Sequence, residues 1–180
     1  MHATLADVIA DTAQNAIEAG AAKVDVALTE RDGRIAVDIR DNGKGMDAAT
    51  VKKAFDPFYT EPGKHDKRKV GLGLPLLKQM CEACGGGVTL ESEKGVGTHL
   101  AYFFDAGNID LPPMGDLADT MVTLFNYPGD FDLVFTHRKG TDEYAIARSE
   151  LADAVGGLDT VEGICLAKEF LSSQESELQG

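Results

Sequence analysis

The sequence of 180 residues has no tryptophan, only three cysteines and no long apolar run. Three cysteines are too few for a disulfide scaffold in a chain of this length. Without an apolar run of membrane-spanning length we expect no transmembrane helix, and the N-terminus lacks the basic and then hydrophobic segments of a secretory signal. We therefore expect a cytoplasmic protein with no membrane partner.

Basic side chains are scarce, because 17 Lys and Arg face 30 Asp and Glu and the net charge is −13. This balance argues against nucleic acid as the main partner. The charge is uneven: residues 106–180 carry 4 basic and 14 acidic side chains, whereas residues 1–105 carry 13 and 16. With Pro112-Pro113 close to this change, the sequence predicts a domain over 1–105 and an acidic α+β extension over 106–180.

Hydrophobic periodicity predicts the order of helices and strands. In the first part we expect a helix over 3–19, strands around 24–28 and 35–39 joined by an Arg31-Asp32-Gly33 turn, helices over 47–54 and 71–84, and strands over 88–92 and 98–104. In the second part we expect a helix near 115–126, strands near 131–137 and 142–148, helices near 149–155 and 160–173, and a frayed end at 174–180. The fold class predicted is α+β, a two-layer sandwich with helices on one face of a sheet.

The stretch Asp41-Asn42-Gly43-Lys44-Gly45-Met46 follows the second predicted strand directly. Gly43 and Gly45 permit backbone conformations and close approaches that a Cβ would obstruct. A carboxylate at Asp41, at the mouth of an apolar pocket, could accept a hydrogen bond from an exocyclic amine such as that of adenine. The alternative is an ordinary turn, for which Asp-Asn-Gly is a common sequence.

Two polar residues of the first predicted helix, Asp11 and Asn15, lie one turn apart on the same face. The amide oxygen of Asn15 could bind a Mg²⁺ ion that also bridges nucleotide phosphates. Asp11 could orient or deprotonate an attacking water. The alternative is a solvated helix face without a ligand.

Two further segments would complete a phosphate-binding pocket. Gly71, Leu72 and Gly73 open a predicted helix, and a helix N-terminus presents backbone N–H groups to anions. Residues 60–70 read as a basic loop, in which Lys67, Arg68 and Lys69 could neutralise a terminal phosphate. Thr98 could support the base through its hydroxyl.

The ordered set of motifs resembles the Bergerat-fold (GHKL) ATPase superfamily, and most closely its histidine kinase branch. The matching segments are Asp11-Thr12-Ala13-Gln14-Asn15-Ala16, Asp41-Asn42-Gly43-Lys44-Gly45-Met46, Asp56-Pro57-Phe58-Tyr59, Gly71-Leu72-Gly73-Leu74 and Gly95-Val96-Gly97-Thr98. The resemblance implies that ATP and Mg²⁺ are the cofactors, that Asn15 is the metal ligand and Asp41 reads adenine, and that residues 60–72 form a lid. It also places Gly43, Gly45, Met46, Phe58 and Leu74 in the ATP pocket. More narrowly, the pattern resembles stand-alone ATP-binding proteins of anaerobes, some associated with iron hydrogenase systems.

Departures from the family pattern leave two functions open. Lys69 stands where a further glycine is usual, Asp11 stands where hydrolytic branches have Glu, and no dimerisation helix carries a phosphoacceptor histidine. The first function is ATP hydrolysis, or transfer of the terminal phosphate to a partner protein, with lid closure. The second is a nucleotide-gated binding module without significant turnover; an anti-sigma-type serine kinase is a third, minor reading. Any protein partner would dock on residues 106–180.

The Cys81-x-x-Cys84 pair could sense redox state or bind a metal. Its place at the C-terminal end of a predicted helix disfavours thiolate, so we expect both cysteines to be packing residues.

Overall fold

The computed structural model describes residues 4–56 and 73–180. Its elements, in chain order, are α1 (Leu5–Glu18), β1 (Lys23–Arg31), β2 (Arg34–Asp41), α2 (Ala48–Lys53), α3 (Gly73–Ala83), β3 (Gly87–Glu93), β4 (Gly97–Asp105), α4 (Leu117–Phe125), β5 (Asp132–Lys139), β6 (Asp142–Ala147), α5 (Arg148–Val155) and α6 (Val161–Gln179). Among these described residues, no helix has both the length and the apolar character needed to cross a membrane.

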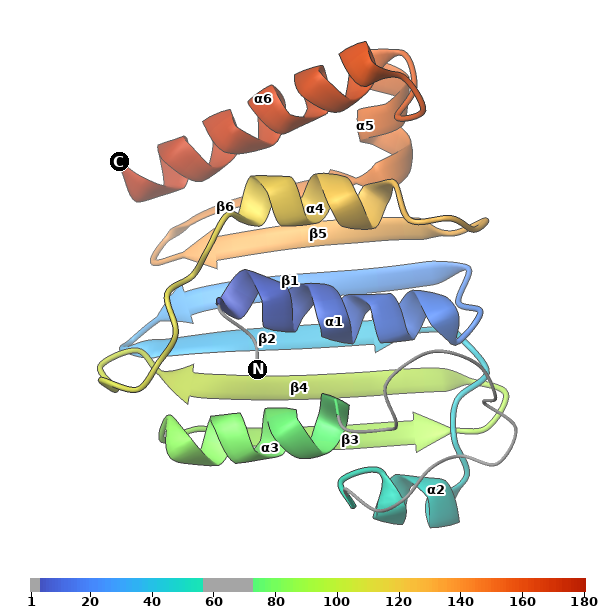
Figure 1. Cartoon of the computed structure of the whole chain (residues 1–180), viewed down its shortest axis with the longest axis vertical. Helices are drawn as coiled ribbons and strands as arrows, with labels where there is room; N and C mark the ends of the chain where they lie inside the picture. The colour runs from blue at the N-terminus through green and yellow to red at the C-terminus, as the bar shows by residue number, and fades with distance from the viewer. Residues whose placement is uncertain (1–3, 57–72) are drawn as a thin grey trace.

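The strands form one six-stranded sheet in the order β3-β4-β2-β1-β5-β6 (Figure 1). Neighbouring strands are antiparallel except β1 and β5, which are parallel. Helices α1, α3 and α4 lie across one face of this sheet (Figure 1). The α+β sandwich predicted from the sequence is therefore confirmed.

The hairpin of β1 and β2 sets the register of the sheet's centre. Asp32 and Gly33 both have positive φ, 52° and 72°, as a two-residue type I′ turn requires. Arg31 therefore pairs with Arg34, and the register continues until Asp41, the last residue of β2, lies opposite Val24. The same strand end pairs with β4, so that Asp41 also lies opposite Thr98.

Two sets of contacts fix helix α1: one determines where the helix begins, and the other determines its rotation about its own axis. Thr4 and Asp7 form a capping box, in which each side chain accepts a hydrogen bond from the other residue's backbone N–H. The buried Thr12 hydroxyl lies 3.0 Å from the hydroxyl of Tyr102 on β4. Because this contact fixes which face of α1 meets the sheet, it also fixes where Asp11 and Asn15 point.

Residues 106–180 extend the same sheet. Strand β4 ends at Asp105, the chain runs through α4, and β5 then pairs along the whole of β1. The side chains of Leu28, Met121, Phe135 and Leu171 are all fully buried in one hydrophobic cluster. The predicted boundary near residue 106 is thus crossed by strand pairing and by the core.

The prediction that residues 174–180 fray is wrong, because α6 continues to Gln179 and Glu175 is buried. His137 is also buried, and its Nδ1 lies 2.9 Å from Oε1 of Glu175 while its Nε2 lies 2.9 Å from Oε1 of Glu30. The Tyr144 hydroxyl donates to the same Glu175 oxygen. This buried cluster joins the end of α6 to three strands, so the last helical turns are held in place.

Candidate functional site

The polar residues of α1 meet the first residue of α3. A Cβ placed on Gly73 would lie 3.3 Å from Oδ2 of Asp11 and 3.9 Å from Nδ2 of Asn15. Asn15 is exposed and Asp11 is half-buried. The structure therefore brings together one end of α3, whose first N–H groups favour anions, and the two side chains singled out in the sequence.

The turn after β2 packs against the C-terminal end of α1. A Cβ on Gly43 would lie 2.8 Å from the backbone oxygen of Ala19, and the Lys44 N–H donates to that same oxygen at 3.0 Å. Gly45 has a φ of 60°, and a Cβ there would lie 1.9 Å from the backbone oxygen of Glu93. Both glycines are thus required by close backbone approach, as the sequence suggested.

The turn between β3 and β4 interlocks with this first glycine turn. The Gly95 N–H donates to the Lys44 carbonyl at 2.7 Å. Gly97 has a φ of 144°, and a Cβ there would lie 2.0 Å from the backbone oxygen of Asp41. The two glycine-bearing segments therefore form one rigid wall beside Asp41 and Thr98.

Asp41 presents a half-buried carboxylate on this wall. Burial raises its pKa, while hydrogen bonds from the backbone N–H groups of Gly43 and Thr98 oppose that rise. The Gly43 N–H lies 2.8 Å from Oδ1. A carboxylate has about four lone-pair sites, so these two N–H groups leave acceptor capacity for a ligand amine.

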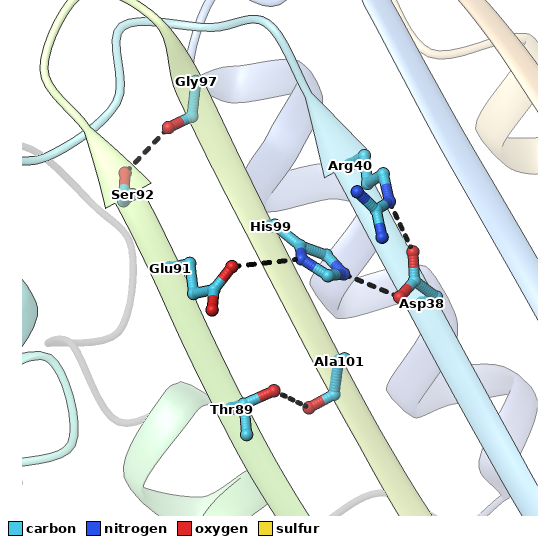
Figure 2. Close-up of polar contacts among 8 residues, drawn as sticks. All are labelled: Asp38, Arg40, Thr89, Glu91, Ser92, Gly97, His99 and Ala101. Atoms are coloured by element: carbon cyan, nitrogen blue, oxygen red, sulfur yellow. Dashed lines mark hydrogen bonds and ion pairs between the residues drawn. The ribbon is translucent and has the colours of Figure 1, made fainter.

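Ser92 on β3 is a site residue that the sequence analysis missed. Its Oγ accepts from the Met46 N–H at 2.8 Å, donates to the Gly97 carbonyl at 2.9 Å and lies 2.8 Å from Oγ1 of Thr98 (Figure 2 draws the Gly97 contact). A serine hydroxyl has one hydrogen, so the Thr98 hydroxyl donates to Ser92 and keeps its own lone pairs for an acceptor role. The sequence feature that could have identified Ser92 is the register of the predicted hairpin, because Ser92 pairs with Thr98 across it.

A second polar cluster lies on the sheet face turned away from α1 (Figure 2). Nε2 of His99 lies 2.6 Å from Oδ2 of Asp38, and its Nδ1 lies 3.6 Å from Oε2 of Glu91. Arg40 pairs with the other oxygen of Asp38 at 3.0 Å. These residues are separated from Asp41 and Thr98 by the sheet itself, so they do not belong to the site.

Several predicted site residues lie outside the described residues, namely Phe58, Lys67, Arg68, Lys69, Gly71 and Leu72. Of the others, Leu74 is partly buried against the core, and Met46 is half-buried and contributes its N–H to Ser92. The geometry above therefore concerns α1, the start of α3 and the two glycine turns.

The donor set suits magnesium bound together with a nucleotide rather than by protein alone. Among residues 4–56 and 73–180, no three His, Cys, Asp or Glu side chains group closely enough to hold a metal ion. Mg²⁺ commonly takes one or two protein oxygens and completes its shell with phosphates and waters. The exposed Asn15 amide beside Gly73, which has no side chain to fill the space, fits such a site.

The cysteine pair Cys81 and Cys84 is not part of the candidate site. Cys81 and Cys84 are buried and not disulfide-bonded. Burial raises the pKa of Cys81 to about 12, and the neighbouring Cys84 and Glu82 add to the rise. A thiol of this kind is an inert packing residue, as expected from its position in the helix.

Comparison with known proteins places these features in a family. The family of histidine kinase-, DNA gyrase B-, and HSP90-like ATPases matches residues 2–108. The heme sensor protein HssS of Staphylococcus saprophyticus is 38% identical over 81 residues, 45% of this chain and 17% of that protein. The sensor protein RprX of Bacteroides fragilis is 36% identical over 104 residues, 54% of this chain and 20% of that protein. This chain thus spans about a fifth of the length of these relatives.

Among solved structures, the N-terminal domain of a DNA repair protein covers 89% of this chain and 58% of its own at a TM-score of 0.58 and 11% identity, a likeness of fold alone. The catalytic domain of the histidine kinase ThkA covers 56% of this chain and 64% of its own, at a TM-score of 0.45 and 23% identity. Together with the family match, the five ordered motifs lead to one conclusion. The chain belongs to the family of histidine kinase-, DNA gyrase B-, and HSP90-like ATPases, and its ATP-binding domain has the histidine kinase type of sequence.

Proposed function

We propose that this protein binds Mg-ATP and turns it over, either by hydrolysis or by transfer of the terminal phosphate to a partner protein. The observation that carries the proposal is that Gly73 lies next to Asp11 and Asn15. A Cβ placed on Gly73 would be 3.3 Å from Oδ2 of Asp11 and 3.9 Å from Nδ2 of Asn15. This arrangement joins an anion-binding helix end to one magnesium-type ligand and one carboxylate. Residues 60–72 would close over the triphosphate as a lid.

Each residue has a separate role in this proposal. Asn15 would hold Mg²⁺, which when bound neutralises charge on the phosphates. Asp11 would orient the attacking group, and the first N–H groups of α3 would contact phosphate oxygens. Lys67, Arg68 and Lys69 would add positive charge from the lid. Asp41, with Thr98 beside it, would accept a hydrogen bond from the adenine amine.

We further propose that residues 1–105 perform the nucleotide chemistry and that residues 106–180 contact a protein partner. Support comes from charge, since the second segment carries 14 acidic and 4 basic side chains. An association with iron hydrogenase systems, suggested by the motif pattern, belongs to the same proposal.

The alternative is a nucleotide-gated module that binds ATP without significant turnover. It is favoured by one feature of the site, since Asp11 is one methylene shorter than the Glu used by hydrolytic branches of the family. A misplacement of about 1 Å can cost roughly 100-fold in rate, so a shorter side chain lowers turnover before it lowers binding.

The deciding experiment measures phosphate release from Mg-ATP and, in parallel, ATP binding by calorimetry. We expect Asn15→Ala to lower turnover roughly 100-fold or more, because the metal then loses its protein ligand. Gln79→Ala, which removes an exposed helix amide on α3, is the matched control and should leave both quantities unchanged.

The three outcomes separate the proposals. Turnover that Asn15→Ala abolishes establishes the enzyme. Binding without turnover establishes the gated module unless phosphate appears on an added partner. Failure of the wild-type protein to bind ATP would show that α1, α3 and the glycine turns do not form a nucleotide site.

A further inference from the structure

A cavity opens at the end of the sheet where β5 begins, the same end at which Asp41 lies. Its volume is about 730 Å³. It is an open cavity, lined by the loop of residues 126–131 between α4 and β5, the start of α5 and the segment before α6. In Figure 1 this loop lies beside the C-terminal end of α1, on the opposite side of α1 from α3.

Within residues 4–56 and 73–180, Arg148 is the one cationic side chain that lines the cavity, and it is already engaged within the wall. Nε of Arg148 donates to the Phe125 carbonyl at 2.7 Å, and Nη1 donates to the Phe131 carbonyl at 2.6 Å. The guanidinium also lies over the Phe131 ring, 4.3 Å from its centroid. Arg148 therefore braces the cavity and is poorly placed to receive an anion.

The accessible charges around the cavity are negative. Asp132 uses both carboxylate oxygens to hold the backbone N–H and hydroxyl of Ser149. Asp130 and Asp159 are exposed lining residues, and neither takes part in a hydrogen bond or ion pair among the described residues. Three aspartates of the lining thus face one arginine, so the formal charge around the cavity stays negative and a cationic occupant would be favoured.

The walls between these carboxylates are aromatic and apolar. Tyr127 and Phe131 line one side, and the buried Leu158 lines another. Lysine and arginine side chains combine an apolar stem with a cationic head, and arginine in particular stacks on aromatic rings. The combination of aromatic wall and acidic rim therefore matches a basic side chain better than an acidic or purely apolar one.

The cavity is also joined to the helix that carries Asp11 and Asn15. The Tyr127 hydroxyl donates to Oε1 of Glu18, and Nε2 of Gln14 lies 3.1 Å from the same hydroxyl and 2.8 Å from Glu18 Oε1. Gln14 and Glu18 lie on α1. The loop that lines the cavity is thus hydrogen-bonded to the same helix as the candidate magnesium ligand.

From this geometry we propose that the cavity is the docking site for an arginine or lysine on an extended segment of a partner protein. The inference rests on the proposed function only in that it gives the protein partner a place and a chemistry. Binding of the basic segment itself requires no ATP, so the two can be tested apart.

The test uses a fluorescently labelled peptide, acetylated and amidated, with one central arginine in a Gly-Ser-Ala context. Its binding to the full chain is followed by anisotropy at low and at physiological salt. We expect saturable binding that the double variant Asp130→Asn/Asp159→Asn weakens by roughly tenfold or more. The matched control, Asp142→Asn/Asp153→Asn, removes two exposed aspartates elsewhere in the acidic segment and should change affinity less than about twofold.

Three results would overturn the proposal. The first is no saturable binding, and the second is equal weakening by both double variants, which indicates general attraction to an acidic surface. The third is equal affinity for a glutamate-centred peptide, since an acidic rim disfavours a carboxylate. ATP binding by the Asp130→Asn/Asp159→Asn variant is measured by calorimetry in parallel. Loss of peptide binding with intact ATP binding then indicates that only the cavity is affected, and not the nucleotide site.

Discussion

At the scale of single residues, the Ser92 hydroxyl links the two glycine turns of the candidate site. Its hydroxyl joins the N–H of Met46, the carbonyl of Gly97 and the hydroxyl of Thr98, each within 2.9 Å. Removing it leaves half-buried groups from both glycine turns without their partner, which typically costs about 1–3 kcal/mol.

We therefore predict that Ser92→Ala weakens ATP binding by roughly 5- to 30-fold, a range that corresponds to about 1–2 kcal/mol. The reason is that Thr98 loses the acceptor that orients its hydroxyl. Calorimetric titration with ATP and with adenosine checks this. Binding of both ligands should weaken, because the proposed contact of Thr98 is with the adenine base that they share. Ser172→Ala on the exposed face of α6 is the control; equal affinity for wild type and Ser92→Ala would contradict the assigned role.

At the scale of elements, α6 is attached to the sheet by the buried cluster of His137, Glu30, Glu175 and Tyr144. Burial alone would lower the pKa of His137, but hydrogen bonds and charges from Glu175 and Glu30 outweigh it and raise the pKa to about 9. The hydrogen bond from His137 correspondingly lowers the pKa of Glu30. The cluster is therefore held together by a protonated imidazole between two carboxylates.

This cluster predicts how stability depends on pH. The folded pKa of His137 is about 9 and the ordinary value is 6.5, so its contribution is complete below pH 6.5 and is lost as pH rises through 9. The free energy of unfolding should fall over this window by up to about 1.4 kcal/mol per pH unit. Urea unfolding of wild type and His137→Gln measures it. The difference between the two curves should shrink toward alkaline pH, and a constant difference would contradict the protonated state.

At the scale of the whole molecule, the two segments that differ in charge share one sheet and one core. Strand β5 pairs with β1 from Lys23 through Glu30, and the backbone N–H groups of Leu5 and Ala6 donate to carbonyls of Pro113 and Met114. Helix α1, which carries Asp11 and Asn15, is therefore bounded on one side by α4, which belongs to the acidic segment.

We predict that a chain ending at Asp105 does not fold to the stability of the full protein. Cutting there leaves the edge of β1 unpaired and removes α4 from beside α1, which exposes apolar surface. Circular dichroism should show either no cooperative transition or a Tm lower by more than about 10 °C. A truncated chain with an unchanged Tm would instead establish residues 1–105 as an independent unit.

The helices, strands and turns that depend on neighbouring residues could be predicted from the sequence. The Asp32-Gly33 turn, the alternation in β1 and β2 and the apolar face of α1 depend on neighbours in sequence, so their structure follows from periodicity and turn preference. Gly45 is likewise indicated by its turn sequence, and its positive φ and close backbone approach leave glycine as the only choice.

Only the tertiary structure decided the contacts between residues far apart in the chain. The sequence predicts a frayed end at Glu175 because nothing within that segment indicates burial, yet its helix is held by His137, which lies on β5, 38 residues earlier in the chain. The bond between Glu18 and Tyr127 spans 109 residues in the same way. Sequence patterns report which face of an element is apolar, whereas polar pairing depends on which faces meet, and that is settled by the packing of the sheet and helices together.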